Sequence, residues 1–126
     1  MVIVDTTTQS IALTRGDYAA LCFCAYESDN QMYELSMGDT VQLQVGKKYG
    51  TPLKKWVKVK EDESATTDAD YTIQISPEDT KDMKFGDYVY DVSIITAGGD
   101  VCTYIGNTGE LEPKFTILKE VGGTDD

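Results

Sequence analysis

Three cysteines are the first residues in this chain that could carry chemistry. Cys22 and Cys24 lie two positions apart, and Cys102 lies far along the chain. These thiols are too few for the four-ligand sites that zinc favours, and the chain has no histidine to complete one. A disulfide between Cys22 and Cys24 is disfavoured, because such bridges need closer Cα atoms than this spacing provides. We therefore expect small buried thiols, no bound metal and no cofactor.

Acidic residues are abundant and give a net charge of −11, with 22 Asp and Glu against 11 Lys and Arg. Asp62, Glu63, Asp68 and Asp70 could gather around calcium, which accepts several oxygen ligands. The run lacks the spacing of a preformed calcium loop, so a flexible acidic loop over 61–70 is the other interpretation. Whether this loop binds calcium stays open at this stage.

Catalysis is not indicated by these carboxylates. A glycosidase needs two of them facing each other across a cleft, whereas alternation places Asp87 and Asp91 toward solvent. The absence of histidine also removes the commonest general base. We expect no catalytic residues, and hence no enzyme. The negative charge further disfavours nucleic acid and membrane surfaces as partners.

The basic residues are concentrated in one hairpin. Six of the 11 lie between residues 47 and 60, and Trp56 stands among them. Lysines on an edge strand prevent sheets from pairing with each other, which explains the lysines without any partner. A docking patch is the alternative, because interfaces use an aromatic anchor inside a charged rim. The partner-binding residues on that hypothesis are Trp56, Lys54, Lys58 and Lys60.

Alternating apolar and polar residues predict that strands position these groups. The expected strands cover 9–14, 18–26, 41–45, 53–60, 71–75, 88–94, 101–105 and 111–118. About eight short strands at even spacing indicate an all-β fold, a two-layer antiparallel immunoglobulin-like β-sandwich with one short helical turn near 77–84. Trp56 and its neighbouring lysines are expected to face outward. The expected core residues are Leu21, Phe23, Val41, Leu43, Val57, Val59, Ile73, Ile75, Tyr88, Tyr90, Val92 and Ile94.

The chain from 76 to 92 is the most informative stretch. Ser76 can cap a helical turn, Pro77 suits its first position, and Asp79 stands where a capping box places a carboxylate. A helical turn, a glycine and Tyr88 two residues later are typical of the E–F corner of immunoglobulin-like sandwiches, where the tyrosine hydroxyl ties the corner down.

This length fits one domain with a short segment on each side of it. Residues 1–8 are expected to form a flexible or strand-exchanging arm, 9–118 the sandwich, and 119–126 an acidic tail. The first residues lack the basic segment and apolar run of a signal peptide, so we expect that they are not one.

Several motifs together resemble a known family. They are Leu13-Thr14-Arg15-Gly16-Asp17-Tyr18, Gly38-Asp39-Thr40-Val41, Ile75-Ser76-Pro77-Glu78-Asp79-Thr80 and Phe85-Gly86-Asp87-Tyr88-Val89-Tyr90-Asp91-Val92, followed by Thr103 and Gly109. The pattern resembles small structural proteins of tailed phages and prophages, in particular the N-terminal domain of phage baseplate upper proteins. The resemblance spans roughly residues 9 to 118.

This resemblance implies a non-enzymatic virion or assembly module of the tail, baseplate or head. It implies other virion proteins or further copies of the chain as partners, a homo-oligomer, and a place in the virion after synthesis in the cytoplasm of a bacterial host. The alternative is a bacterial surface or ligand-binding immunoglobulin-like module that calcium stabilises.

Overall fold

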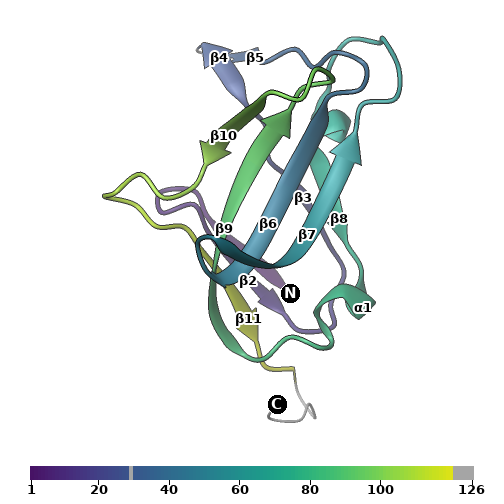
Figure 1. Cartoon of the computed structure of the whole chain (residues 1–126). Helices are drawn as coiled ribbons and strands as arrows, with labels where there is room; N and C mark the ends of the chain where they lie inside the picture. The colour runs from purple at the N-terminus through teal and green to yellow at the C-terminus, as the bar shows by residue number, and fades with distance from the viewer. Residues whose placement is uncertain (29, 121–126) are drawn as a thin grey trace.

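A computed structural model describes residues 1–28 and 30–120 of the chain. These residues form strands and two short helical turns (Figure 1). The strands are β1 Val2–Asp5, β2 Ser10–Thr14, β3 Ala19–Cys22, β4 Tyr26–Ser28, β5 Gln31–Met32, β6 Thr40–Lys48, β7 Thr51–Val59, β8 Thr72–Ile75, β9 Gly86–Ile95, β10 Val101–Ile105 and β11 Lys114–Leu118. The helical turns are η1 Asp68–Tyr71 and α1 Pro77–Thr80, so the expected all-β class is confirmed.

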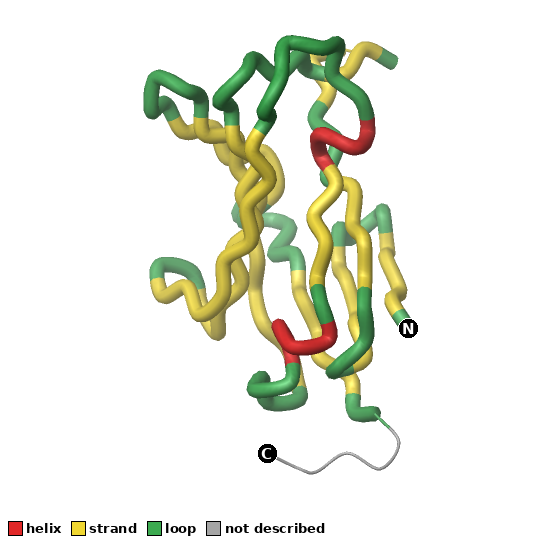
Figure 2. Tube along the Cα trace, turned by 90° about the vertical axis from the view of Figure 1, so that its right-hand side faces the viewer, coloured by secondary structure: helices red, strands yellow, loops and turns green. Residues whose placement is uncertain are grey.

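Seven strands form the larger sheet, in the order β1-β2-β11-β9-β6-β7, with β10 paired beside β11 on β9. A second sheet contains β3 and β8, and β4 pairs with β5. Figure 2 shows the strands in two facing layers. Most pairs are antiparallel as expected, but β2 and β11 run parallel, with Ile11 opposite Phe115. A strand can take a parallel neighbour here because long connections separate the two in the chain.

The core lies between the two sheets. Alternate residues of β9 point into it, and β3 and β8 contribute Leu21, Ile73 and Ile75 from the opposite side. All of the expected core residues are buried except Val57 and Val59. The alternation therefore identified the inner face of every expected core strand but one.

The prediction of which side chains of β7 face the core was wrong. Val57 and Val59 are 54% and 42% exposed, whereas Trp56 packs against the core. The register with β6 explains the reversal, because it places Trp56 opposite the fully buried Leu43. Side chains of directly paired residues lie on the same face of a sheet. Trp56 therefore faces inward, and the valines face outward.

The corner before β9 is built as expected. Ser76 and Asp79 form the capping box of α1, and Pro77 occupies the start of the turn. The Tyr88 hydroxyl donates a hydrogen bond to the backbone oxygen of Lys84 at 2.7 Å. The helical turn ends at Thr80 rather than near residue 84. This tyrosine bond ties the turn to the first part of the long strand.

The N-terminal segment, expected to be a flexible or strand-exchanging arm, forms a strand of the chain's own sheet. Residues 2–5 form β1, which pairs antiparallel with β2 along its whole length. At the other end, the Glu120 carboxylate accepts hydrogen bonds from the buried Arg15, the shortest of them 2.7 Å. The rest of the expected acidic tail, 121–126, lies outside the described residues. The ordered part of the domain thus begins earlier than the alternation indicated, because β1 completes one side of the sheet.

Candidate functional site

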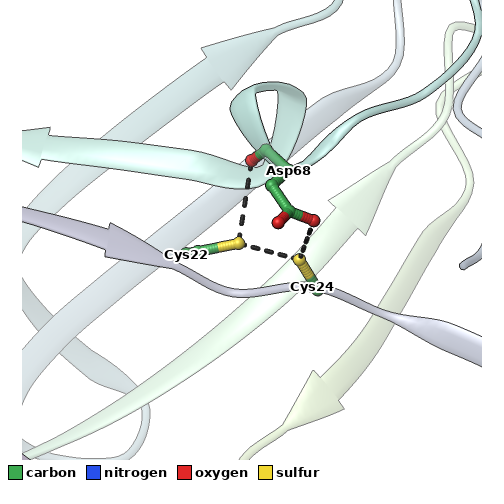
Figure 3. Close-up of side chains that lie close together, drawn as sticks. All are labelled: Cys22, Cys24 and Asp68. Atoms are coloured by element: carbon green, nitrogen blue, oxygen red, sulfur yellow. Dashed lines mark hydrogen bonds between the residues drawn. The ribbon is translucent and has the colours of Figure 1, made fainter.

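Two thiols and a carboxylate converge at the end of β3. Cys22 is its last residue, Cys24 follows two positions later, and Asp68 begins η1 (Figure 3). The Cys22 and Cys24 Sγ atoms lie 2.7 Å apart, and Cys24 Sγ lies 3.4 Å from Asp68 Oδ1. Cys22 Sγ also lies 3.7 Å from the backbone oxygen of Asp68. We call these three residues the dithiol cluster.

The pairing of β3 with β8 places the dithiol cluster. The register of β3 with β8 sets Cys22 opposite Thr72, directly after η1. The Phe23 N–H then donates to the Tyr71 oxygen at 3.1 Å, which continues the pairing past the end of β3. Asp68 therefore meets the thiols although it is 46 residues from Cys22 in the chain. Nothing in the spacing of the sequence indicated this contact.

The surroundings of the dithiol cluster favour the protonated form of the Cys24 thiol. Burial raises the pKa of the Cys24 thiol well above its ordinary range, and hydrogen bonds to Cys22 and Asp68 raise it further. The expectation of buried thiols was nevertheless wrong, because Cys22 and Cys102 are exposed and Cys24 is only half-buried. The thiol and carboxylate atoms of these three residues all lie within 4.8 Å of one another. Among the described residues, no other group of three cysteine, aspartate or glutamate side chains is so close.

The acidic loop does not gather its four carboxylates. Asp62 and Asp70 instead flank the Lys60 ammonium, with Nζ 3.3 Å from Asp62 Oδ1 and 3.2 Å from Asp70 Oδ2. Asp68 turns toward the thiols, and Glu63 is exposed. A lysine ammonium therefore occupies the position in which the calcium hypothesis would put the cation.

Lys60 is accordingly not an outward-facing residue. Its side chain is 1% exposed. Desolvation lowers the pKa of Lys60, but the hydrogen bonds to Asp70 and Asp62 outweigh this effect and raise the pKa above its usual value. The lysine is thus held charged inside the chain, and its contacts are to the chain's own carboxylates.

Trp56 has partners in its own chain as well. Its indole Nε1–H donates to Asp79 Oδ2 at 3.0 Å, and Lys54 Nζ lies 2.8 Å from Asp82 Oδ1. Burial raises the pKa of Asp79, but the hydrogen bonds from Trp56 and Ser76 outweigh it and leave the pKa below its usual value. The ring also lines a groove of about 390 Å³ between β7 and β8. These contacts tie the end of the capped turn to β7.

Of the four expected docking residues, Lys58 is the one that is exposed. Trp56 and Lys54 are half-buried, and Lys60 is buried. The structure therefore brings them to one strand face but not to an open surface with an exposed aromatic anchor. A docking role for this hairpin stays a prediction.

A second surface feature is the exposed apolar edge of the larger sheet at β1. The edge strand β1 exposes Val2, Ile3 and Val4 by 38%, 53% and 52%. The Thr14 N–H donates to the Met1 oxygen at 2.9 Å. Hydrogen-bonded pairs alternate along an antiparallel ladder, so Ile3 bonds toward β2 while the N–H and C=O groups of Val2 and Val4 point to the free edge. The β-branched composition of residues 2–4 was the available clue.

Comparisons with known protein families, with curated proteins and with solved structures found no significant match to this chain. Within residues 1–28 and 30–120, no helix is long and apolar enough to cross a membrane.

Proposed function

We propose that this protein is a non-enzymatic assembly module of a tailed-phage or prophage virion, built as an immunoglobulin-like sandwich. It acts through contacts with copies of itself and with other virion proteins, after synthesis in the bacterial host cytoplasm. The observation that carries the assembly role is the apolar free edge at β1. The phage assignment rests on the motifs quoted above, above all the stretch from Phe85 to Val92.

Strand order supports the immunoglobulin-like part of the proposal. The run β11-β9-β6-β7 corresponds to strands G, F, C and C′ of a variable-type sheet, and β3 with β8 corresponds to B and E. Strand G is then interrupted, because β10 and β11 pair with successive parts of β9. The bond from the Tyr88 hydroxyl to Lys84 agrees with the tyrosine corner at the start of strand F.

The occupant that we assign to the free edge is β1 of a second copy. Antiparallel pairing with Ile3 opposite Ile3 of the second copy sets each Val2 opposite Val4. All the outward backbone groups of these two residues then form hydrogen bonds, four in all, by the alternation described above. The contact is isologous and closes as a dimer. It also keeps most of the chain's negative charge away from the contact, because the one acidic residue of β1, Asp5, lies at the end of the strand.

Sedimentation velocity over a concentration series tests this assignment. Val4→Pro removes the outward N–H and leaves the bonds to β2 in place. Across a symmetric dimer the change removes two hydrogen bonds, and we expect about thirtyfold weaker association, equivalent to about 2 kcal/mol. Val4→Thr is the matched control, because it keeps the N–H and nearly the same shape. A wild type that stays monomeric at millimolar concentration would overturn self-assembly through β1.

The virion assignment has a separate test. The gene should lie among capsid, tail or lysis genes, and a neighbourhood without any of them would contradict the assignment. The alternative, a calcium-stabilised bacterial surface module, has less support, since Asp62 and Asp70 bind Lys60. A thermal melt that rises with added calcium would favour that alternative.

A further inference from the structure

We propose that the dithiol cluster binds a thiophilic divalent cation, with Zn²⁺ as the natural candidate. The ligands are the Sγ atoms of Cys22 and Cys24 and the carboxylate of Asp68. This inference departs from the sequence-based expectation of no metal, which counted the thiols without the carboxylate that folding brings to them. It does not depend on the proposed function.

The ligands come from two segments that are already fixed relative to each other. The Thr72 hydroxyl donates to the Asp68 backbone oxygen at 2.8 Å, and the Thr67 N–H donates to Asp70 Oδ2 at 3.0 Å. These bonds fix the shape of η1 at its junction with β8, and the pairing of β8 with β3 holds η1 beside the end of β3. Binding therefore requires little ordering of the backbone, which removes a large part of the entropic cost of assembling a site.

The ligand types decide which cation is suitable. Two sulfur atoms favour zinc and its softer analogues over calcium and magnesium, which prefer oxygen. On binding, each thiol S–H loses its proton to solvent, and the two thiolates and the carboxylate share the cation. Once the thiols are deprotonated, the two thiolates and the carboxylate repel one another, and the divalent charge between them offsets that repulsion.

The thiols must move apart to admit the ion. Two sulfurs on one zinc lie about 3.8 Å from each other, given Zn–S bonds of about 2.3 Å in a tetrahedron. The present separation of 2.7 Å therefore has to grow by roughly one ångström. Rotation of the exposed Cys22 side chain supplies this movement without a change in the core. With three side-chain ligands, we expect weaker binding than in a closed four-cysteine site.

Cadmium is the experimental probe, because its thiolate complexes absorb in the ultraviolet. The full chain is kept reduced with a phosphine and titrated with Cd²⁺, and Zn²⁺ is then added as a competitor. We expect one equivalent to bind with thiolate-to-metal absorption and Zn²⁺ to displace it. Cys22→Ser or Cys24→Ser should weaken binding by about a hundredfold, and Asp68→Asn by about tenfold.

Cys102→Ser is the matched control, because Cys102 is an exposed thiol on β10 that does not belong to the group of ligand atoms within 4.8 Å of one another. It should leave the affinity unchanged, and circular dichroism should confirm that every variant is folded. The proposal is overturned if Cys102→Ser weakens binding as much as Cys24→Ser does. It is also overturned if the double variant Cys22→Ser, Cys24→Ser still binds one equivalent, or if Cd²⁺ binds only by joining two copies. Val4→Pro should bind Cd²⁺ normally, so failure of the assembly proposal would be separate.

Discussion

The two edges of the larger sheet are built in opposite ways. Among the described strands, β1 and β7 stand at the ends of the sheet. The strand β1 exposes three β-branched side chains and has no lysine. The strand β7 carries Lys54, Lys55 and Lys58, and its one aromatic residue, Trp56, faces the core.

The sequence suggested two roles for the lysine-rich hairpin, protection of a sheet edge and docking of a partner, and the structure gives the features of these roles to different edges. Lysines protect an edge because pairing with another strand would bury or oppose their charges. An edge without lysines leaves its backbone groups open to a further strand. The β7 edge therefore has the features of protection, and the β1 edge has the features of a contact. Four experiments test this difference between the two edges.

The largest expected effect is on folding, at β7. Trp56→Ala removes a half-buried ring that packs against the core and bonds Asp79. We expect it to lower the free energy of unfolding by about 2 to 3 kcal/mol, below the range for fully buried aromatic residues. Urea denaturation gives the value. Val57→Ala, one position away on the outer face, should cost less than about 0.5 kcal/mol. Equal costs for the two variants would contradict the observed facing of β7.

The next effect is on association, at β1. Ile3→Lys places two like charges opposite each other in the proposed dimer, which is the device that β7 already uses. We expect at least about tenfold weaker association and an unfolding free energy within about 0.5 kcal/mol of the wild type. Sedimentation equilibrium and urea denaturation measure the two. Unchanged association would show that β1 does not form the contact.

Removing the protection at β7 should have a smaller and opposite effect. In the double variant Lys55→Val, Lys58→Val, β7 keeps only Lys54, which is paired with Asp82, so that open-ended assembly through both edges becomes possible. We expect species larger than a dimer in light scattering at high concentration. Adding Val4→Pro should return these species to a dimer through β7 alone. A double variant no larger than the wild type would mean that the lysines are not what protects this edge.

The smallest effect is a loss of stability in acid that involves β7 and not β1. The pKa of Asp79 is lowered in the folded state because hydrogen bonds outweigh its desolvation, and the pKa of Asp82 is lowered by Lys54. A carboxylate with a lowered pKa stabilises the fold above its unfolded pKa of about 4, and this contribution is lost as the pH falls further. Solvent exposure keeps the loss from Asp79 below about 1 kcal/mol.

Urea denaturation between pH 7 and pH 3 measures this loss, and Asp79→Asn should reduce its size. Association through β1 should not weaken over the upper part of the same range, because the net charge of −11 shrinks toward zero near the pI of 4.2. Weaker association on approach to the pI would indicate that ion pairs, rather than apolar contact, join the copies.

The alternation of apolar and polar residues determined most of the fold. It located β2, β6, β8, β9 and β10 and nearly all of the core, because a strand's side chains must alternate wherever one face is buried. The capping box and the tyrosine bond were also predictable, because both depend on residues within a few positions of each other. Local physics decides local structure, and these features needed nothing else.

Only the tertiary structure decided which face of β7 is buried and which distant groups meet. The strand has valines on one face and Trp56 on the other, so its own pattern allows either choice until the register with Leu43 is set. Likewise, Cys24 and Asp68 are 44 residues apart, and only the pairing of β3 with β8 brings them together. Pairing between strands is a long-range choice made by the whole core, and a single strand's sequence does not contain it.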